Sequence, residues 1–178
     1  NPLPACMGRV CYHPCETACN RGELDECVGI NAIERFLSDE ALRRRWRFEP
    51  PAESTGKRVL VVGAGPSGLS AAYHLARLGH GVTIREAGPV PGGMMRFGIP
   101  KYRLPREVLD AEIQRIVDLG VALELNSKVS NLLEAQRAGR FDAVFLAVGA
   151  HIAKRAYIPA GSASKMLDAV SVLRGMEG

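Results

Sequence analysis

The chain has 178 residues, 47% of them hydrophobic and 24% charged, which is ordinary for a globular protein and allows a core over most of its length. Its net charge of +4, without a basic stripe interleaved with aromatic residues, gives no support for nucleic-acid binding. No apolar run of about 18 residues is present, so we expect no transmembrane helix.

The N-terminal sequence is Asn1-Pro2-Leu3-Pro4, with no initiator Met and no signal-peptide pattern. We therefore expect a fragment of a longer, cytoplasmic protein. A secreted, disulfide-stapled domain would spread its cysteines through its core, whereas local clustering favours metal or cluster ligation. All five cysteines fall within the first 27 residues: Cys6, Cys11, Cys15, Cys19 and Cys27.

Three stretches differ in pattern. Residues 1–48 are Cys-rich and then helical, residues 49–56 form a linker rich in Pro and Gly, and residues 57–178 alternate strand and helix. In the first stretch, apolar residues at three- and four-residue spacing predict a helix over about residues 29–45. The face expected to be apolar consists of Ile30, Ile33, Phe36, Leu37 and Ala41.

In the third stretch, short apolar runs predict buried strands and amphipathic runs predict helices. The expected strands are residues 58–62, 81–85, 121–125 and 141–148, and the expected helices are residues 67–78, 106–119 and 165–174. This order implies a parallel sheet with right-handed crossovers. The predicted fold class is α/β: a Rossmann-like parallel sheet preceded by a small Cys-containing helical domain.

A glycine motif of the form G-x-G-x-x-G follows the first predicted strand and opens the first helix of the sheet domain. In this context Gly63 allows a tight turn, Gly65 lets the backbone approach a pyrophosphate, and Gly68 lets the helix pack closely on the strand. The start of that helix would present free N–H groups to the phosphates. The motif therefore predicts a dinucleotide site.

Glu86 ends the second predicted strand, where a carboxylate can accept hydrogen bonds from both ribose hydroxyls. It would also repel a 2′-phosphate, which disfavours NADP at this site. These residues alone leave FAD and NAD open. The adjacent pair Gly92-Gly93 favours FAD, because it permits a second close approach of backbone to ligand.

Cys11, Cys15 and Cys19 are each separated by three residues. On a helical turn they would share a face, so their thiolates could converge on one site. The paired C-x2-C knuckles of zinc ribbons are absent, whereas iron–sulfur clusters accept varied cysteine spacings. Free thiols in a small helical cap are the alternative.

These motifs together resemble the small (beta) subunit of bacterial glutamate synthase and its relatives, which include the N-terminal part of dihydropyrimidine dehydrogenase. The resemblance covers nearly the whole chain. The matching segments are residues 8–11, Cys15, residues 19–22, residues 61–69, Glu86, residues 92–93, residues 98–105 and residues 147–150.

The resemblance implies that the Rossmann-like unit binds FAD. For Arg103, the alternative to a flavin contact is a salt bridge within its loop. The implied contacts are Gly63, Ala64, Gly65, Pro66, Ser67, Gly68, Glu86, Ala87, Gly92, Gly93, Met94, Arg103, Val129, Ala147 and Gly149.

The resemblance also implies two [4Fe–4S] clusters in the N-terminal helical domain. Their ligands would come from an upstream Cys group and from positions matching Cys11, Cys15 and Cys19, while Glu34 aligns with a Gln ligand. The upstream group is missing from this chain, and we do not count Cys6 or Cys27. We therefore expect complete clusters in the full-length protein and not in this chain.

By the same resemblance, the protein is an FAD-dependent NAD(P)H oxidoreductase. Electrons would pass from NADPH, bound by a domain outside this chain, to FAD and through iron–sulfur clusters to a partner such as a glutamate synthase large subunit. We expect no catalytic acid or base in this chain and no activity from it alone. The competing class is a non-catalytic nucleotide-binding or regulatory module.

Overall fold

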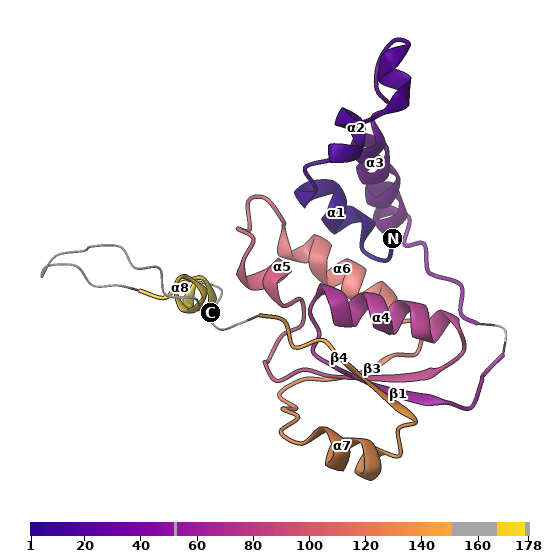
Figure 1. The fold of residues 1–178 in the computed structure, drawn as a ribbon, viewed down its shortest axis with the longest axis vertical. Coiled ribbons are helices and arrows are strands. Elements are labelled where there is room, and N and C mark those ends of the chain that lie inside the picture. Colours follow the sequence, from indigo (N-terminus) through magenta and orange to yellow (C-terminus); the bar gives the residue numbers. More distant parts are fainter. Residues whose placement is uncertain (52, 151–166, 177–178) are drawn as a thin grey trace, which may run out of the picture.

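The computed structural model describes residues 1–51, 53–150 and 167–176 of the chain (Figure 1). The chain opens with a helical part that packs on one side of an α/β part (Figure 1). This part comprises α1 (Pro4–Val10), α2 (Pro14–Thr17), the 3-10 helix η1 (Asn20–Glu23) and α3 (Ile30–Arg43). Among the described helices, none combines the length and apolar character needed to cross a membrane.

The α/β part contains four parallel strands in the order β3-β2-β1-β4. The strands are β1 (Arg58–Val62), β2 (Gly81–Arg85), β3 (Ala122–Glu124) and β4 (Ala143–Leu146). Val61 of β1 pairs with Ile84 of β2 on one side and with Phe145 of β4 on the other. The predicted parallel sheet is confirmed, although β3 and β4 are shorter than expected. Their pairing stops where their partner strands end, at Arg85 of β2 and Val62 of β1.

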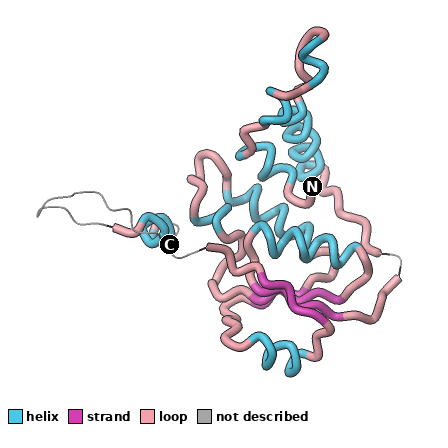
Figure 2. Tube along the Cα trace, viewed as in Figure 1, coloured by secondary structure: helices cyan, strands magenta, loops and turns pink. Residues whose placement is uncertain are grey.

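Helices cover both faces of this sheet, as the cyan helices above and below the magenta strands in Figure 2 show. On one face lie α4 (Pro66–Arg77) and α6 (Arg106–Val117), both predicted from periodicity. On the other lies α7 (Leu132–Gly139), which the sequence analysis missed because its eight residues form only about two turns. The short helix α5 (Met94–Phe97) was also missed, and α8 (Ala169–Gly175) matches the described part of the helix expected at residues 165–174.

The main core lies between the sheet and helices α4 and α6. Leu69, Ile84, Leu109 and Ile116 are fully buried there. Leu3 and Cys6 from the N-terminal part belong to the same buried cluster, so this part shares the core of the sheet. A smaller cluster of Leu60, Val62 and Phe141 lies on the opposite face, with Val129 packed against it.

The predicted inward face of α3 is wrong for most of its members. Ile30, Ile33, Phe36 and Leu37 are 44–67% exposed, and only Ala41 of the predicted set is buried. Periodicity identifies residues that share a helix face but not what covers that face. Helix α1 contacts a different part of α3, where a Cβ on Gly8 would lie 2.8 Å from the Cβ of Arg35.

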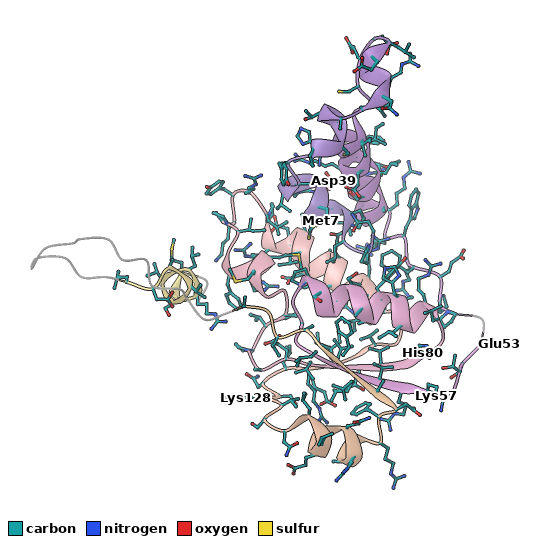
Figure 3. The ribbon with its side chains drawn as sticks, in the orientation of Figure 1. Met7, Asp39, Glu53, Lys57, His80 and Lys128 are labelled. Carbon is teal, nitrogen blue, oxygen red and sulfur yellow. The ribbon has the colours of Figure 1, made fainter. Side chains whose placement is uncertain are left out.

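Polar contacts fix the segments that flank the core. Arg9 on α1 forms an ion pair with Asp39 on α3 at 2.7 Å, and Figure 3 labels Asp39 beside α1. Before β1, the Thr55 hydroxyl lies 2.7 Å from Nδ1 of His80, and the backbone N–H of Thr55 donates to the Gly79 carbonyl. These bonds attach the stretch before β1 to the end of α4.

The closest packing in the sheet domain predicts a large effect for one methyl group. A Cβ on Gly68 would lie 1.9 Å from the carbonyl oxygen of Gly63 and 3.2 Å from Cγ1 of Val61, so β1 and α4 must separate to admit it. We expect Gly68→Ala to lower the free energy of unfolding by about 1–3 kcal/mol, measured by urea denaturation with circular dichroism.

Gly81→Ala is the matched control for this prediction. Its Cβ would have its nearest neighbours at 3.6 Å, an ordinary contact, and it lies on β2, the strand that pairs with β1. Its stability should stay close to that of the wild type. Equal losses in the two variants would contradict the close contact between β1 and α4.

Candidate nucleotide-binding site and cysteine segment

The turn between β1 and α4 brings backbone atoms so close at Gly63 that no side chain fits there. Gly63 has a φ of +107°, and a Cβ there would lie 2.4 Å from the carbonyl oxygen of Ala147 after β4. Its N–H donates to the carbonyl of Arg85 at 2.8 Å, while the Ala147 N–H donates to Val62 at the same distance. The carboxyl ends of β1, β2 and β4 therefore meet at this turn.

Helix α4 starts at this turn without a side-chain cap. Gly65 occupies the N-cap position, Pro66 follows at the first helical position, and no side chain bonds the free N–H groups of the first turn. Ser67 is exposed and Gly68 is buried against β1. Uncapped N–H groups at the start of a helix of this length are suited to bind phosphate oxygens.

A second glycine loop touches the first. The N–H of Gly92 donates to the carbonyl of Ala64 at 2.8 Å, and a Cβ on Gly93 would lie 2.8 Å from the Cα of Gly65. Both Gly92 and Gly93 have positive φ angles, of +116° and +52°. The two loops thus form one side-chain-free surface beside the start of α4, which fits the close approach of a dinucleotide.

Glu86 lies beside both loops, at the end of β2. Its Oε2 accepts a hydrogen bond from the N–H of Ala64 and its Oε1 accepts one from the N–H of Gly88, both at 2.8 Å. An ionised carboxylate offers about four acceptor positions, so two remain for ribose hydroxyls. The side chain is half-buried and is therefore held in place while still reachable.

Two arginines that the sequence analysis did not single out organise the loop after Gly93. Buried Arg96 donates from Nε to the Pro91 carbonyl at 2.6 Å and forms an ion pair with Asp110 on α6. Arg106 donates to the carbonyls of Ile99 and Leu104, each at 2.8 Å. Periodicity could not reveal these residues, because most of their partners are backbone carbonyls in an irregular loop.

The remaining predicted contacts lie at several places around this edge. Ala147 and Gly149 follow β4, Ala87 is exposed directly after Glu86, and Met94 starts α5. Arg103 is exposed, and its Nη2 donates to the carbonyl of Val10 on α1 at 3.4 Å. The structure thus brings the glycines, Ala64, Glu86 and Ala147 together, whereas Val129 packs on the α7 side of the sheet and Arg103 extends towards α1.

The expected shared helix face for the three spaced cysteines is wrong. Cys11 caps the end of α1, Cys15 lies within α2, and Cys19 precedes η1. The helix breaks between the first two because His13 has a φ of +44° and Pro14 starts a new helix. In the part of the chain that the structure describes, no three His, Cys, Asp or Glu side chains gather closely enough to hold a metal.

The chemistry of these cysteines nevertheless suits metal ligation. Cys11 and Cys15 are exposed, and the N–H of His13 lies 3.3 Å from Sγ of Cys11. Hydrogen bonds from the backbone N–H groups of Val28, Arg21 and Gly22 lower the pKa of the Cys19 thiol, which favours its thiolate. The donor type fits an iron–sulfur cluster, but the described residues of this chain do not assemble a ligand set.

Three other residues considered for ligation have different surroundings. Glu34 lies on α3 and accepts a hydrogen bond from Nδ2 of Asn1 at 2.7 Å. Cys27 is exposed, whereas Cys6 is buried in the shared core. Burial, followed by the charge of Glu112, raises the pKa of the Cys6 thiol, so it stays protonated at neutral pH.

Comparison with known proteins identifies the two parts of the chain. Residues 1–46 match the family model described as dihydropyrimidine dehydrogenase domain II, 4Fe-4S cluster. Residues 61–126 match the family described as an NAD(P)-binding Rossmann-like domain. The predicted order, a cysteine-rich segment of 4Fe–4S type followed by a Rossmann-like domain, is therefore confirmed.

Among curated proteins, the chain is 43% identical to the NADP(+)-dependent formate dehydrogenase subunit beta of Moorella thermoacetica, over 86% of this chain and 25% of the relative. It is 40% identical to glutamate synthase [NADH] of Schizosaccharomyces pombe, over 89% of this chain and 8% of the relative. It is also 40% identical to the NAD-dependent dihydropyrimidine dehydrogenase subunit PreT of Salmonella typhimurium, over 84% of this chain and 37% of the relative.

The chain thus spans between 8% and 37% of the length of these three relatives. The two family matches and these identities confirm the resemblance carried by the glycine and cysteine motifs. The chain is a relative of glutamate synthase and of the PreT subunit of dihydropyrimidine dehydrogenase, with a 4Fe–4S-type segment followed by a Rossmann-like domain.

Proposed function

We propose that this chain is the FAD-binding part of an electron-input flavoprotein, an NAD(P)H oxidoreductase resembling the glutamate synthase small subunit. In the full-length protein, electrons would pass from NAD(P)H through FAD and [4Fe–4S] clusters to a partner subunit or domain. The observation that carries this proposal is the contact between the two glycine loops, Gly65 against Gly93, beside the uncapped start of α4 and Glu86.

The same geometry supports FAD over NADP at this site. The carboxylate of Glu86 accepts hydrogen bonds and would repel a 2′-phosphate. The loop of Gly92 and Gly93 adds a second backbone surface, which suits the longer FAD molecule. FAD, when bound, supplies hydride acceptance and one-electron donation, and the protein supplies binding and orientation. NADPH would bind through a domain outside this chain.

Each part of the site has a proposed role. The first N–H groups of α4 hold the pyrophosphate, Glu86 holds the ribose, and Arg96 and Arg106 keep the second loop in place. The proposed cofactor contacts are Gly63, Ala64, Gly65, Pro66, Ser67, Gly68, Glu86, Ala87, Gly92, Gly93, Met94, Arg103, Val129, Ala147 and Gly149.

For the clusters, we propose that Cys11, Cys15, Cys19 and Glu34 act together with ligands outside this chain. Donors beyond the chain are needed because the described residues gather no ligand set. The proposal includes a cytoplasmic location and an electron-accepting partner such as a glutamate synthase large subunit. It places the helical cluster-type domain at residues 1–48, the linker at 49–56 and the FAD-binding domain at 57–178.

A second candidate is a nucleotide-binding or regulatory module that binds NAD(P) at the same site without redox chemistry. The family description of residues 61–126 as NAD(P)-binding favours it. If the full-length protein is a flavoprotein, anaerobic addition of NADPH should bleach its flavin absorbance. A colourless protein, or one whose absorbance is unchanged by both NADPH and NADH, would support the second candidate instead.

The ribose contact gives a prediction for Glu86. We expect Glu86→Ala in the full-length protein to weaken FAD binding by about 1–3 kcal/mol, because ribose hydroxyls and the N–H groups of Ala64 and Gly88 lose their acceptor. The measurement is the flavin dissociation constant after removal and titration of the cofactor.

Glu124→Ala is the matched control, since Glu124 ends the neighbouring strand β3 and pairs with Arg85 at 2.8 Å. It should bind FAD as the wild type does. If Glu86→Ala retains flavin as well as this control, Glu86 is not the ribose ligand.

The contact between the glycine loops gives a prediction for Gly93. Both Gly93 and Gly120 have positive φ, so alanine is strained at either position, and the ψ of −133° at Gly93 also lies outside the left-handed helical region. Only at Gly93 does the new Cβ meet another backbone, since nothing lies within 4 Å at Gly120. Gly93→Ala should therefore raise the FAD dissociation constant about tenfold or more relative to Gly120→Ala. Equal affinities would show that the loop contact does not shape the site.

The cysteine proposal predicts the iron content. Anaerobically purified full-length protein should contain iron and acid-labile sulfide, whereas this chain alone should contain little, because it gathers no ligand set among its described residues. Cys11→Ser should lower the iron content of the full-length protein, and Cys27→Ser, also an exposed cysteine, should not. Stoichiometric iron in the isolated chain, or equal iron in both variants, would contradict this ligand assignment.

A further inference from the structure

A buried carboxylate joins the N-terminal helices to the sheet domain. Glu112 on α6 has no exposed surface. Its Oε1 accepts a hydrogen bond from the N–H of Ala5, and its Oε2 accepts one from the N–H of Cys6, both at 2.8 Å. These N–H groups lie in the first turn of α1, where a helix offers them no acceptor of its own.

The surroundings of Glu112 leave it few other interactions. The Cys6 thiol also donates to this carboxylate, and Arg115, one turn further along α6, contributes a nearby positive charge. The Nε and Nη1 atoms of Arg115 form no hydrogen bond in the described part of the chain, and its guanidinium lies over the ring of Phe48 at 4.1 Å. Burial raises the pKa of Glu112, and the hydrogen bonds from α1 together with the charge of Arg115 oppose this effect.

The other end of α1 also contacts the sheet domain. Arg103, in the loop that follows the second glycine pair, donates to the carbonyl of Val10 at 3.4 Å. Cys11 comes directly after Val10. Helix α1 is thus held at its start by Glu112 and at its end by Arg103, and Figure 1 shows it beside α6. Because Arg103 is exposed and its bond is long, Glu112 is the stronger of these two polar attachments, which add to the burial of Leu3 and Cys6 in the shared core.

We infer that Glu112 is a positioning residue: its carboxylate clasps the first turn of α1 and thereby fixes the cysteine segment relative to the nucleotide site. The relative position of the cysteine segment and the nucleotide site matters through the proposed function, in which electrons pass from one to the other. The clasp itself is a property of the chain and does not depend on any bound cofactor.

Hydrogen exchange of the full-length protein tests the clasp directly. In the wild type, the amides of Ala5 and Cys6 should exchange slowly although they begin a helix, because Glu112 is their acceptor. Glu112→Gln leaves one of them facing an amide NH2 group. We expect these two amides, and the reaction of the Cys6 thiol with a thiol reagent, to become about tenfold faster or more. Amides of β1 should keep their protection.

Glu107→Gln is the matched control, because Glu107 is exposed on the same helix, and it should leave all these rates unchanged. Glu112→Asp retains the charge with a shorter reach, and it should fall between wild type and Glu112→Gln if the latter fails to fold. Fast exchange of Ala5 and Cys6 in the wild type would overturn the inference. So would an equal loss of protection at β1 and α1, which would indicate general destabilisation.

This test is independent of the proposed function. If the full-length protein contains no FAD, the function proposal fails while the exchange result still decides the clasp. If FAD is present, its bleaching by NADPH should proceed at the wild-type rate in Glu112→Gln, because the Glu112 carboxylate accepts its hydrogen bonds from α1 and not from the glycine loops. Slow bleaching together with unchanged exchange would place Glu112 in the nucleotide site and contradict the inference.

Discussion

The structure depends on close approach of backbone to backbone at the carboxyl edge of the sheet. A Cβ on Gly68 would lie 1.9 Å from the Gly63 carbonyl, and a Cβ on Gly63 would lie 2.4 Å from that of Ala147. These contacts set the position of α4 against β1 and of β4 against both. The same absence of side chains leaves the start of α4 open, so one constraint serves both folding and ligand approach.

Two glutamates show how burial assigns different tasks to the same chemical group. Glu86 and Glu112 each accept two backbone N–H groups at 2.8 Å. Glu86 is half-buried at an open edge and keeps acceptor positions for a ligand. Glu112 is fully buried and also accepts a hydrogen bond from the Cys6 thiol. It therefore serves to hold α1 against α6. The position of Glu86 at the end of the second strand indicates its role, whereas the partners of Glu112 lie more than 100 residues away in the sequence.

The sequence was most informative where local pattern and tertiary structure depend on the same residues. The runs at β1 and β2 and the glycine motif predicted the parallel sheet and its turn, because their hydrophobicity and spacing directly encode burial and close packing. Helix α7 was missed because its eight residues form only about two turns, too few for a spacing pattern to stand out. The roles of Arg96 and Arg106 were missed because they bond carbonyls of an irregular loop, and that of Glu112 because its partners lie in a distant segment.

Predictions failed where a local sequence pattern was used to infer which distant residues would cover a helix face or meet a group of side chains. The cysteine spacing suggested one helix face, but the left-handed His13 followed by Pro14 divides the segment into separate helices. The apolar face of α3 was read correctly as a stripe and wrongly as a buried one.

The central claim is that the paired glycine loops and Glu86 hold FAD. Its most direct test is the identity of the nucleotide released when the purified full-length protein is denatured. The account predicts FAD at about one per chain, with no NAD or NADP in its place. Release of NAD(P) at that stoichiometry, or a full-length protein that takes up no FAD on incubation with it, would contradict the account.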